Sequence, residues 1–225
     1  MRLAARTTLR ANALLFDMDG TLVNSAAVIA GLWRHWAARH CLDPEAVLLA
    51  SPGRRTIETV RIFAPLGTDA PAEAARLAAA AAETTEGLAA TPGASALLHS
   101  LPRDYWAVVT SADHALARCW MRQVGLPLPD VLVTAEDVPA GKPDPAGYLQ
   151  ALSRLGCDPA DAIVFEDAPS GLAAGLAAGA RVVAIASTLI PAELHGHEWL
   201  PDFSGMTCMA TQDGSVTVRV GEVTL

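Results

Sequence analysis

The chain has 225 residues, a length that fits one large domain or a domain carrying an insert. Hydrophobic residues make up 52% of it, which is enough for a buried core, and the formal net charge is −8 at pH 7. This acidic balance argues against a nucleic-acid-binding surface, which needs a basic patch. The four cysteines are scattered without a C-x-x-C pair, which predicts free thiols and a cytoplasmic location.

The first residues, 1–16, carry three arginines and no acid and run directly into an apolar stretch. We expect a short basic arm or strand there. Residues 171–190 are apolar over a length typical of a membrane span, but Arg181 interrupts them. A glycine-rich helix followed by a buried strand explains this stretch better, so we expect no membrane partner.

Short apolar runs rich in β-forming residues recur along the chain, separated by stretches with helical patterns. Strands are predicted at 13–16, 106–111, 131–135, 162–165 and 181–186, and helices at 113–124, 143–155 and 169–179. Alternating strands and helices indicate a doubly wound, parallel α/β sheet covered on both faces. Such sheets bind ligands at the carboxyl ends of their strands.

Residues 24–91 interrupt this alternation, because they contain helical patterns and no convincing strand. One helix surrounds GLWRHWAARH, with Leu32, Trp33 and Trp36 on one stripe, and two more follow in the stretches 51–65 and 71–90. We therefore predict a core domain of residues 1–23 and 92–225 and a helical cap domain of residues 24–91. After Met206, the segments VTVRV and VTL predict strands or a hairpin added to the edge of the sheet.

Chemically suggestive groups follow several of the predicted strands. Asp17 and Asp19 follow the first, Thr110 and Ser111 end the second, and Glu166 with Asp167 follow the fourth. Two acids as close as the first pair repel each other, so a positive charge is expected between them. Their hard oxygen atoms suit Mg²⁺. One carboxylate of the first pair would contact the metal, and the other would be free to move a proton.

Lys142 is the only lysine among the 16 basic residues, and it lies in the loop GKPDP. A compact ammonium group fits a tight, phosphate-sized space that a planar guanidinium does not. Lys142 and the Thr110 hydroxyl could therefore stabilise the charge on the oxygens of a phosphoryl group.

The motifs DMDGT, Thr110, GKPDP and FEDAPSG, in this order and rough spacing, resemble those of the haloacid dehalogenase superfamily. The resemblance extends over essentially the whole chain and implies a Rossmann-like core with a small helical cap. More narrowly, GRRTIETVRIFAP and VFEDAPSGLAAG resemble the branch of glycerol-3-phosphate, 2-deoxyglucose-6-phosphate and related sugar-phosphate phosphatases.

The resemblance implies a role for each matching residue. Asp17 would form an aspartyl-phosphate, and Asp19 would act as general acid and base. Mg²⁺ would be bound by Asp17, Asp167, Glu166 and the backbone carbonyl of Asp19. Thr110 and Lys142 would hold the phosphoryl oxygens, and we expect Gly20, Ser111, Arg55 and Thr56 to contact the substrate.

The favoured function is therefore a Mg²⁺-dependent phosphatase acting on a small sugar or polyol phosphate, expected to be a monomer with no nucleic-acid partner. A sugar phosphomutase keeps the same motifs and is the alternative enzyme. A signalling domain that stores an aspartyl-phosphate is the alternative from another class. The acid two residues after Asp17 and the large insert both favour turnover over storage.

Overall fold

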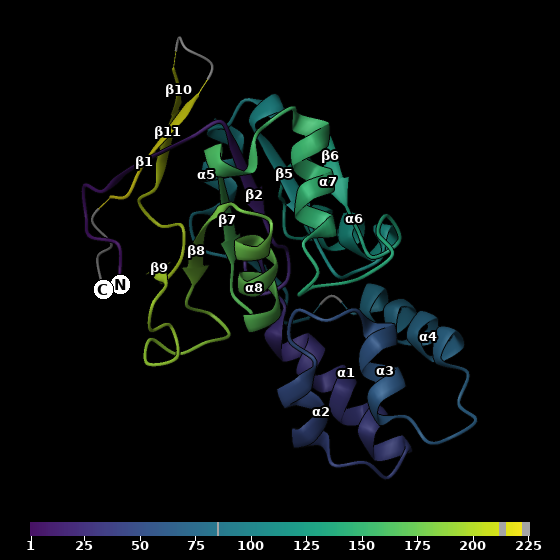
Figure 1. Cartoon of the computed structure of the whole chain (residues 1–225). Helices are drawn as coiled ribbons and strands as arrows, with labels where there is room; N and C mark the ends of the chain where they lie inside the picture. The colour runs from purple at the N-terminus through teal and green to yellow at the C-terminus, as the bar shows by residue number, and fades with distance from the viewer. Residues whose placement is uncertain (85, 212–214, 222–225) are drawn as a thin grey trace.

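The computed structural model of the protein, which describes residues 1–84, 86–211 and 215–221, is built around the predicted parallel sheet (Figure 1). All neighbouring strands of this sheet run parallel. In spatial order they are β6 (Val131–Val133), β5 (Trp106–Val109), β2 (Ala13–Phe16), β7 (Ala162–Glu166), β8 (Arg181–Ile185) and β9 (Glu198–Leu200). The doubly wound α/β fold is thus confirmed. Strand β9, which the sequence analysis did not predict, is only three residues long.

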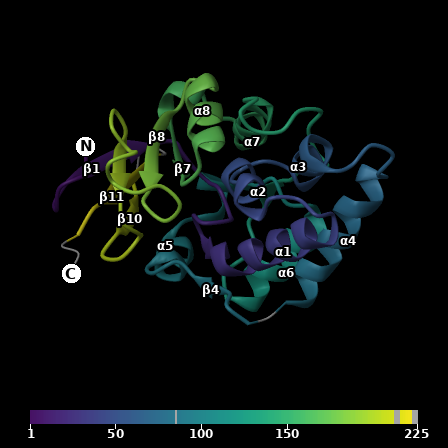
Figure 2. The ribbon, with the colours of Figure 1, turned by 90° about the horizontal axis from the view of Figure 1, so that it is seen from below.

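Helices cover both faces of this sheet (Figure 2). They are α5 (Ala94–Ser100) and α6 (His114–Gln123) on one face, and α7 (Ala146–Leu155) and α8 (Pro169–Ala177) on the other. Two 3-10 turns, Arg103–Tyr105 and Pro159–Asp161, precede β5 and β7. The helices predicted at 113–124, 143–155 and 169–179 are therefore present, but α7 begins at Ala146, after Pro145.

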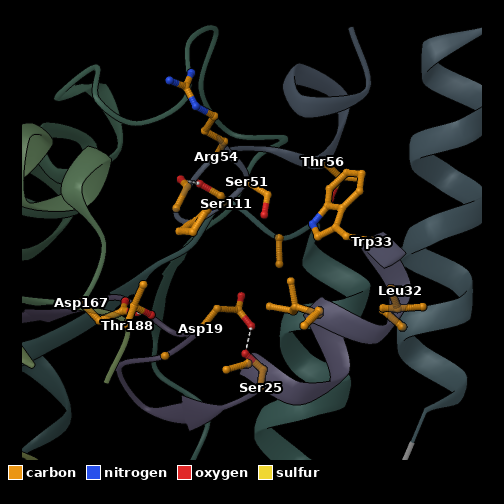
Figure 3. Close-up of a pocket in the computed structure, with 18 of the residues that line it drawn as sticks. Asp19, Ser25, Leu32, Trp33, Ser51, Arg54, Thr56, Ser111, Asp167 and Thr188 are labelled. Carbon is orange, nitrogen blue, oxygen red and sulfur yellow. Dashed lines mark hydrogen bonds between the residues drawn. The ribbon is translucent and has the colours of Figure 1, made fainter. Parts of the chain in front are cut away.

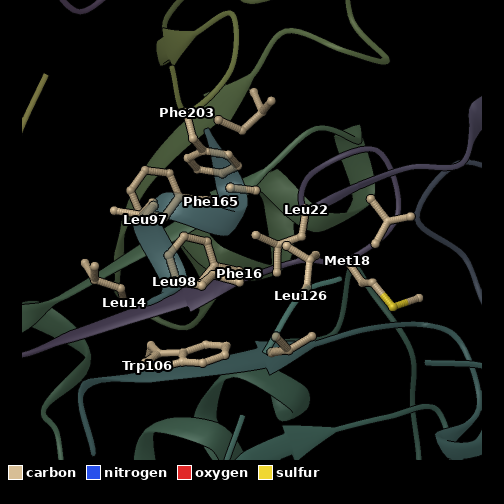
Figure 4. Packing of buried hydrophobic residues seen from close by; sticks show 14 of the residues in the cluster. Leu14, Phe16, Met18, Leu22, Leu97, Leu98, Trp106, Leu126, Phe165 and Phe203 are labelled. Carbon is tan, nitrogen blue, oxygen red and sulfur yellow. The ribbon is translucent and has the colours of Figure 1, made fainter. Parts of the chain in front are cut away.

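Side chains of β2 alternate between the two faces, as a buried strand requires. Leu14 and Phe16 belong to the hydrophobic cluster on the α5–α6 side, whereas Leu15 belongs to the cluster on the α7–α8 side. Phe16 stacks on Phe165 of the neighbouring strand β7, with ring centroids 5.0 Å apart (Figure 4). This packing fixes the end of β2, and with it the position of the residues that follow.

Along the chain, four helices are inserted between β2 and the remaining elements of the core. They are α1 (Ala26–Arg39), α2 (Pro44–Ala50), α3 (Thr56–Phe63) and α4 (Ala70–Glu83). They have their own hydrophobic cluster, which includes Trp36, Val60 and Leu77. Helix α2 was not predicted. Its first turn is capped by the Asp43 side chain, which accepts a hydrogen bond from the Glu45 N–H at 3.0 Å. The helices lie beyond the carboxyl ends of the strands (Figure 1).

Two short antiparallel strands join these helices to the core. Strand β3 (Val23–Asn24) pairs with β4 (Ala89–Ala90), so the segments entering and leaving the helical insert lie side by side. These strands were not predicted, because two residues carry no periodic signal. The division into domains at residues 24 and 91 remains our proposal, and we call residues 24–91 the cap.

The two ends of the chain form a separate antiparallel sheet with the strand order β1-β11-β10. Its strands are β1 (Thr8–Ala11), β11 (Val216–Arg219) and β10 (Thr207–Ala210). Strand β10 was not predicted. The predicted basic strand and the predicted strand at VTVRV are present, as β1 and β11, but they do not extend the parallel sheet. They pair instead with one another because Leu9, Val216 and Val218 bury one face against the core. The predicted segment VTL lies outside the described residues.

Within the described parts of the chain, no helix is both long and apolar enough to cross a bilayer. The apolar stretch 171–190 divides, as predicted, between helix α8 and strand β8. All four cysteines lie in the described parts and carry free thiols.

Candidate active site

The carboxyl ends of the parallel strands bring the predicted polar residues together. The Lys142 ammonium donates hydrogen bonds to Asp17 Oδ1 at 2.5 Å and Glu166 Oε1 at 2.6 Å. A third bond, of 3.1 Å, goes to the carbonyl oxygen of Val109 at the end of β5. The loop after β6, the end of β2 and the end of β7 are therefore joined through one buried cation.

Several hydrogen bonds fix the position of the Glu166 carboxylate. Its Oε1 also accepts a hydrogen bond of 2.6 Å from the Tyr148 hydroxyl, and its Oε2 accepts one of 3.1 Å from the Asp167 N–H. A methyl group added at Gly171 would lie only 1.8 Å from Glu166 Oε1, so glycine is required where α8 passes this side chain. The sequence analysis missed Tyr148. Its one signal was its place in the helix that follows the Lys142 loop.

Oxygen atoms of Asp17, Glu166 and Asp167 all lie within 4.8 Å of one another. Asp167 accepts hydrogen bonds from Thr21, at 3.2 Å, and from Thr188. A buried group of hard oxygen donors is the ligand type that Mg²⁺ prefers, so the residues present fit this ion.

Gly20 lies against the same carboxylates. Its φ is +79°, and a methyl group added there would be 2.1 Å from Asp167 Oδ2. Both the left-handed backbone and the close approach exclude other residues at this position. The turn after β2 is therefore built to bring its backbone close to Asp167.

Asp19 lies in the same turn, directly before Gly20, and is partly exposed. Its Oδ1 accepts a hydrogen bond of 2.8 Å from the Ser25 hydroxyl (Figure 3). Burial raises the pKa of Asp19 to about 6, although the Ser25 hydrogen bond opposes the rise. A carboxyl group with a pKa near neutrality can both give and take a proton, which suits a general acid–base catalyst.

The neighbouring carboxyl groups are shifted in the same direction. Burial and the charge of Glu166 raise the pKa of Asp17 well above its usual value, and they raise the pKa of Asp167 to about 7. Burial disfavours the charged form of Lys142, but the charges of Asp17 and Glu166 outweigh it and raise the pKa of the ammonium. Lys142 is therefore positively charged. Its single charge does not offset burial and the repulsion among the carboxylates, so a bound divalent cation would be needed to favour their ionised forms.

A cavity of about 360 Å³ opens in front of Asp17, Asp19 and Asp167. It is bounded by the core on one side and by the cap helices on the other (Figure 3). Three of the residues expected to contact the substrate, Gly20, Ser111 and Thr56, line this cavity, and their contact with substrate stays a prediction. Thr110 and Lys142 line a smaller adjoining pocket that shares Ser111 with the cavity. Lys142 thus reaches the cavity through its contact with Asp17.

The geometry agrees with the comparison with known proteins. Residues 11–179 match a hydrolase family described as haloacid dehalogenase-like hydrolase. The chain belongs to this family. The resemblance drawn from the motifs is thereby confirmed. The matched residues include DMDGT, Thr110, GKPDP and FEDAPSG.

The relatives of this hydrolase include named phosphatases. The chain is 44% identical over 181 residues to hexitol phosphatase A of Escherichia coli, and the alignment covers 79% of this chain and 84% of that protein. It is 38% identical over 192 residues to glycerol-1-phosphate phosphohydrolase 2 of Saccharomyces cerevisiae, covering 80% and 77%. A solved hydrolase structure from Pseudomonas syringae shares the fold, with a TM-score of 0.76, 23% identity and coverage of 85% and 94%.

The two adjacent arginines of the hydrolase's cap, Arg54 and Arg55, lie in different surroundings. Arg55 lies outside the large cavity, and its guanidinium donates hydrogen bonds to the carbonyl oxygens of Ala135, Val138 and Pro139 at 3.0–3.3 Å. Arg54 lines the cavity at its rim, with its guanidinium directed away from the carboxylates (Figure 3). In this arrangement Arg55 joins the cap to the core, and substrate contact by Arg55 or Thr56 remains a prediction.

Without divalent cations, the free energy of unfolding of the hydrolase is expected to fall as the pH rises from about 4 to about 7. The pKa of Asp19 is raised from 3.8 to about 6 and that of Asp167 to about 7, so the folded state holds more protons than the unfolded state in this window. Adding Mg²⁺ should then raise the Tm more at about pH 8 than at about pH 5, since bound metal favours ionised carboxylates. Scanning calorimetry at both pH values measures this.

The variant Asp167→Asn provides the control for this experiment. It removes one of the titrating groups and one ligand, so both the pH dependence and the Mg²⁺-induced rise in Tm should shrink. An equal Tm with and without Mg²⁺ at about pH 8 would contradict metal binding at this site.

Proposed function

We propose that this chain is a Mg²⁺-dependent phosphatase that hydrolyses a small sugar or polyol phosphate through an aspartyl-phosphate. The observation that carries the proposal is the 2.5 Å contact between Lys142 Nζ and Asp17 Oδ1, beside Asp167 at the end of an open cavity. An aspartate held by a buried cation, next to a carboxylate group suited to Mg²⁺, is arranged to attack a phosphorus atom. The names of the relatives, which include a hexitol phosphatase and a glycerol-1-phosphate phosphohydrolase, support the same chemistry.

In the first step, an Asp17 carboxylate oxygen attacks the phosphorus atom, and the ester P–O bond breaks. Protonated Asp19 gives its proton to the departing alcohol oxygen. The Lys142 charge opposes the rise in the pKa of Asp17 that burial and Glu166 cause, and a bound divalent cation would favour the ionised nucleophile further. Asp17 and Asp167 would hold Mg²⁺, together with the Asp19 backbone carbonyl, while Glu166 orients Lys142. When bound, Mg²⁺ supplies positive charge that balances the phosphoryl oxygens.

In the second step, Asp19, now a carboxylate, takes a proton from a water molecule. The water oxygen attacks the phosphorus atom, the bond to Asp17 breaks, and inorganic phosphate is released. Because the pKa of Asp19 is about 6, its protonated and ionised forms are both accessible near neutral pH, as the two steps require. The Ser25 hydrogen bond keeps the carboxyl group oriented toward the cavity.

The proposal predicts steady release of inorganic phosphate from esters such as glycerol phosphate, a hexitol phosphate and 2-deoxyglucose 6-phosphate, dependent on Mg²⁺. Many turnovers for each protein molecule are expected, and chelation of the metal should abolish them. Accumulation of one equivalent of stable phosphoprotein would instead identify a signalling switch. Movement of the phosphoryl group to another hydroxyl of the sugar, without release of phosphate, would identify a phosphomutase.

A further inference from the structure

The cavity in front of the site carboxylates has two unlike sides. Carboxylates and hydroxyl groups lie at the core end. The opposite side is made by α1, α4 and α6, and we call it the apolar wall; its principal residues are Ile29, Leu32, Trp33, Leu77, Ala81 and Leu116. Leu32 and Trp33 project from α1 beside the cavity (Figure 3).

Trp120 of α6 also lines this side of the cavity and contributes apolar surface to it. Its indole N–H donates to the carbonyl oxygen of Ala81 at 3.1 Å, so this polar group is already used within the protein. Trp33 packs edge-on against Trp36, with ring centroids 5.4 Å apart, which fixes the position of its ring. The apolar wall is therefore a rigid surface.

Several hydroxyl groups around the cavity are also committed to the protein. Ser111 donates to the carbonyl oxygen of Gly53 at 2.7 Å, and Ser187 donates to that of Gly20 at 2.5 Å. Ser25 donates to Asp19. The loop 51–56 adds Ser51 and Thr56 to the lining of the cavity (Figure 3).

These features make the cavity selective for the carbon part of the ester. A hydroxyl group pressed against the apolar wall loses its water and gains no partner, which costs binding free energy. A CH₂ group at the same place gains free energy when it leaves water. An alcohol that carries hydroxyl groups on every side therefore fits the cavity less well than one with a bare hydrocarbon side.

We propose that the preferred substrate is the phosphate ester of an alcohol with a hydrocarbon side, formed by several CH or CH₂ groups, that lies on the apolar wall. Hydroxyl groups, where present, face the loop 51–56. This inference rests on the proposed phosphatase function and narrows the substrate class of the same site. Among the sugar and polyol phosphates that the site accepts, it favours those whose carbon skeleton leaves one side without hydroxyl groups.

The test compares two esters of similar size, cyclohexylmethyl phosphate and glucose 6-phosphate. Both join a six-membered ring to the phosphate through one CH₂ group, but the first ring is hydrocarbon throughout. The kcat/KM for cyclohexylmethyl phosphate is expected to exceed that for glucose 6-phosphate by at least about tenfold. Release of inorganic phosphate in Mg²⁺ is the measurement.

A pair of variants on α4 tests whether the apolar wall causes the preference. Ala78 lines the cavity, whereas Ala79 is exposed on the same helix. Ala78→Gln places an amide in the cavity and should lower the ratio of the two kcat/KM values at least about fivefold. Ala79→Gln introduces the same side chain outside the cavity and should leave the ratio unchanged. Both are helix-compatible, and the Tm of each checks the fold.

The outcomes separate the two proposals. Preference for the hydrocarbon ring, reduced by Ala78→Gln alone, supports the inference. Preference for glucose 6-phosphate, or an equal ratio in both variants and the wild type, overturns it while the phosphatase function stands. If neither these esters nor glycerol phosphate were hydrolysed in Mg²⁺, the proposed phosphatase function itself would fail.

Discussion

Replacement of Asp17 by Asn is expected to abolish phosphate release, lowering kcat by on the order of 10³-fold or more. The amide has no free carboxylate oxygen to attack phosphorus, so no covalent intermediate can form. The fold should survive because Asn has the same shape, and its amide oxygen can still accept the hydrogen bond from Lys142. Steady-state phosphate release and the Tm measure the two effects.

Two other variants sharpen this result. Asp104→Asn removes an exposed carboxylate elsewhere in the core and should leave kcat unchanged. Asp19→Asn keeps the nucleophile but removes the proton donor, so it should retain more activity toward an ester with an acidic leaving group than toward an alkyl ester. Turnover like that of the wild type in Asp17→Asn would rule out the covalent mechanism.

Replacement of Lys142 by Arg is expected to lower kcat/KM by roughly 10²-fold or more, although the positive charge is kept. The ammonium meets three acceptors within 3.1 Å in a buried site. A planar guanidinium is larger and cannot direct its donors to the same three atoms. Asp17 would then move away from the position in which it attacks the phosphorus atom, and a small displacement costs much of the rate.

Arg122→Lys reverses the exchange at an exposed position and provides a control that should have no effect. If Lys142→Arg does not fold, Lys142→Met, which has a similar length and no charge, tests the same contact. This variant should be inactive as well, because the carboxylates of Asp17 and Glu166 lose the positive charge that lies between them and offsets their repulsion. A kcat/KM near that of the wild type in either variant would show that Lys142 is not needed for the reaction.

The alternation of strands and helices in the sequence already determined where the acids and the lysine had to meet. Asp17, Thr110 and Glu166 each stand at or just after the end of a predicted parallel strand. Strands joined by right-handed crossovers point the same way, so their ends must share one edge of the sheet. The core of the candidate site followed from this rule, and its Nζ–Oδ1 contact agrees with it.

Tyr148 could not be found in the same way. It lies in the middle of a helix with buried neighbours, a pattern that fits any core residue. Its hydroxyl group became meaningful when the fold placed it 2.6 Å from Glu166. Sequence periodicity gives the face on which a side chain lies, but it does not give the atom that the side chain meets.

The sheet, the helical insert and the acidic and basic groups at the strand ends could all be predicted, because local patterns and crossover handedness fix them. The direction of Arg54 and Arg55 became known only from the folded chain, as did the difference between Trp33, which lines the cavity, and Trp36, which does not. Apolar residues that line a cavity have the same helical spacing as those that fill a core. The packing of α4 against both α1 and α6, which are distant in sequence, decides which of the two they do.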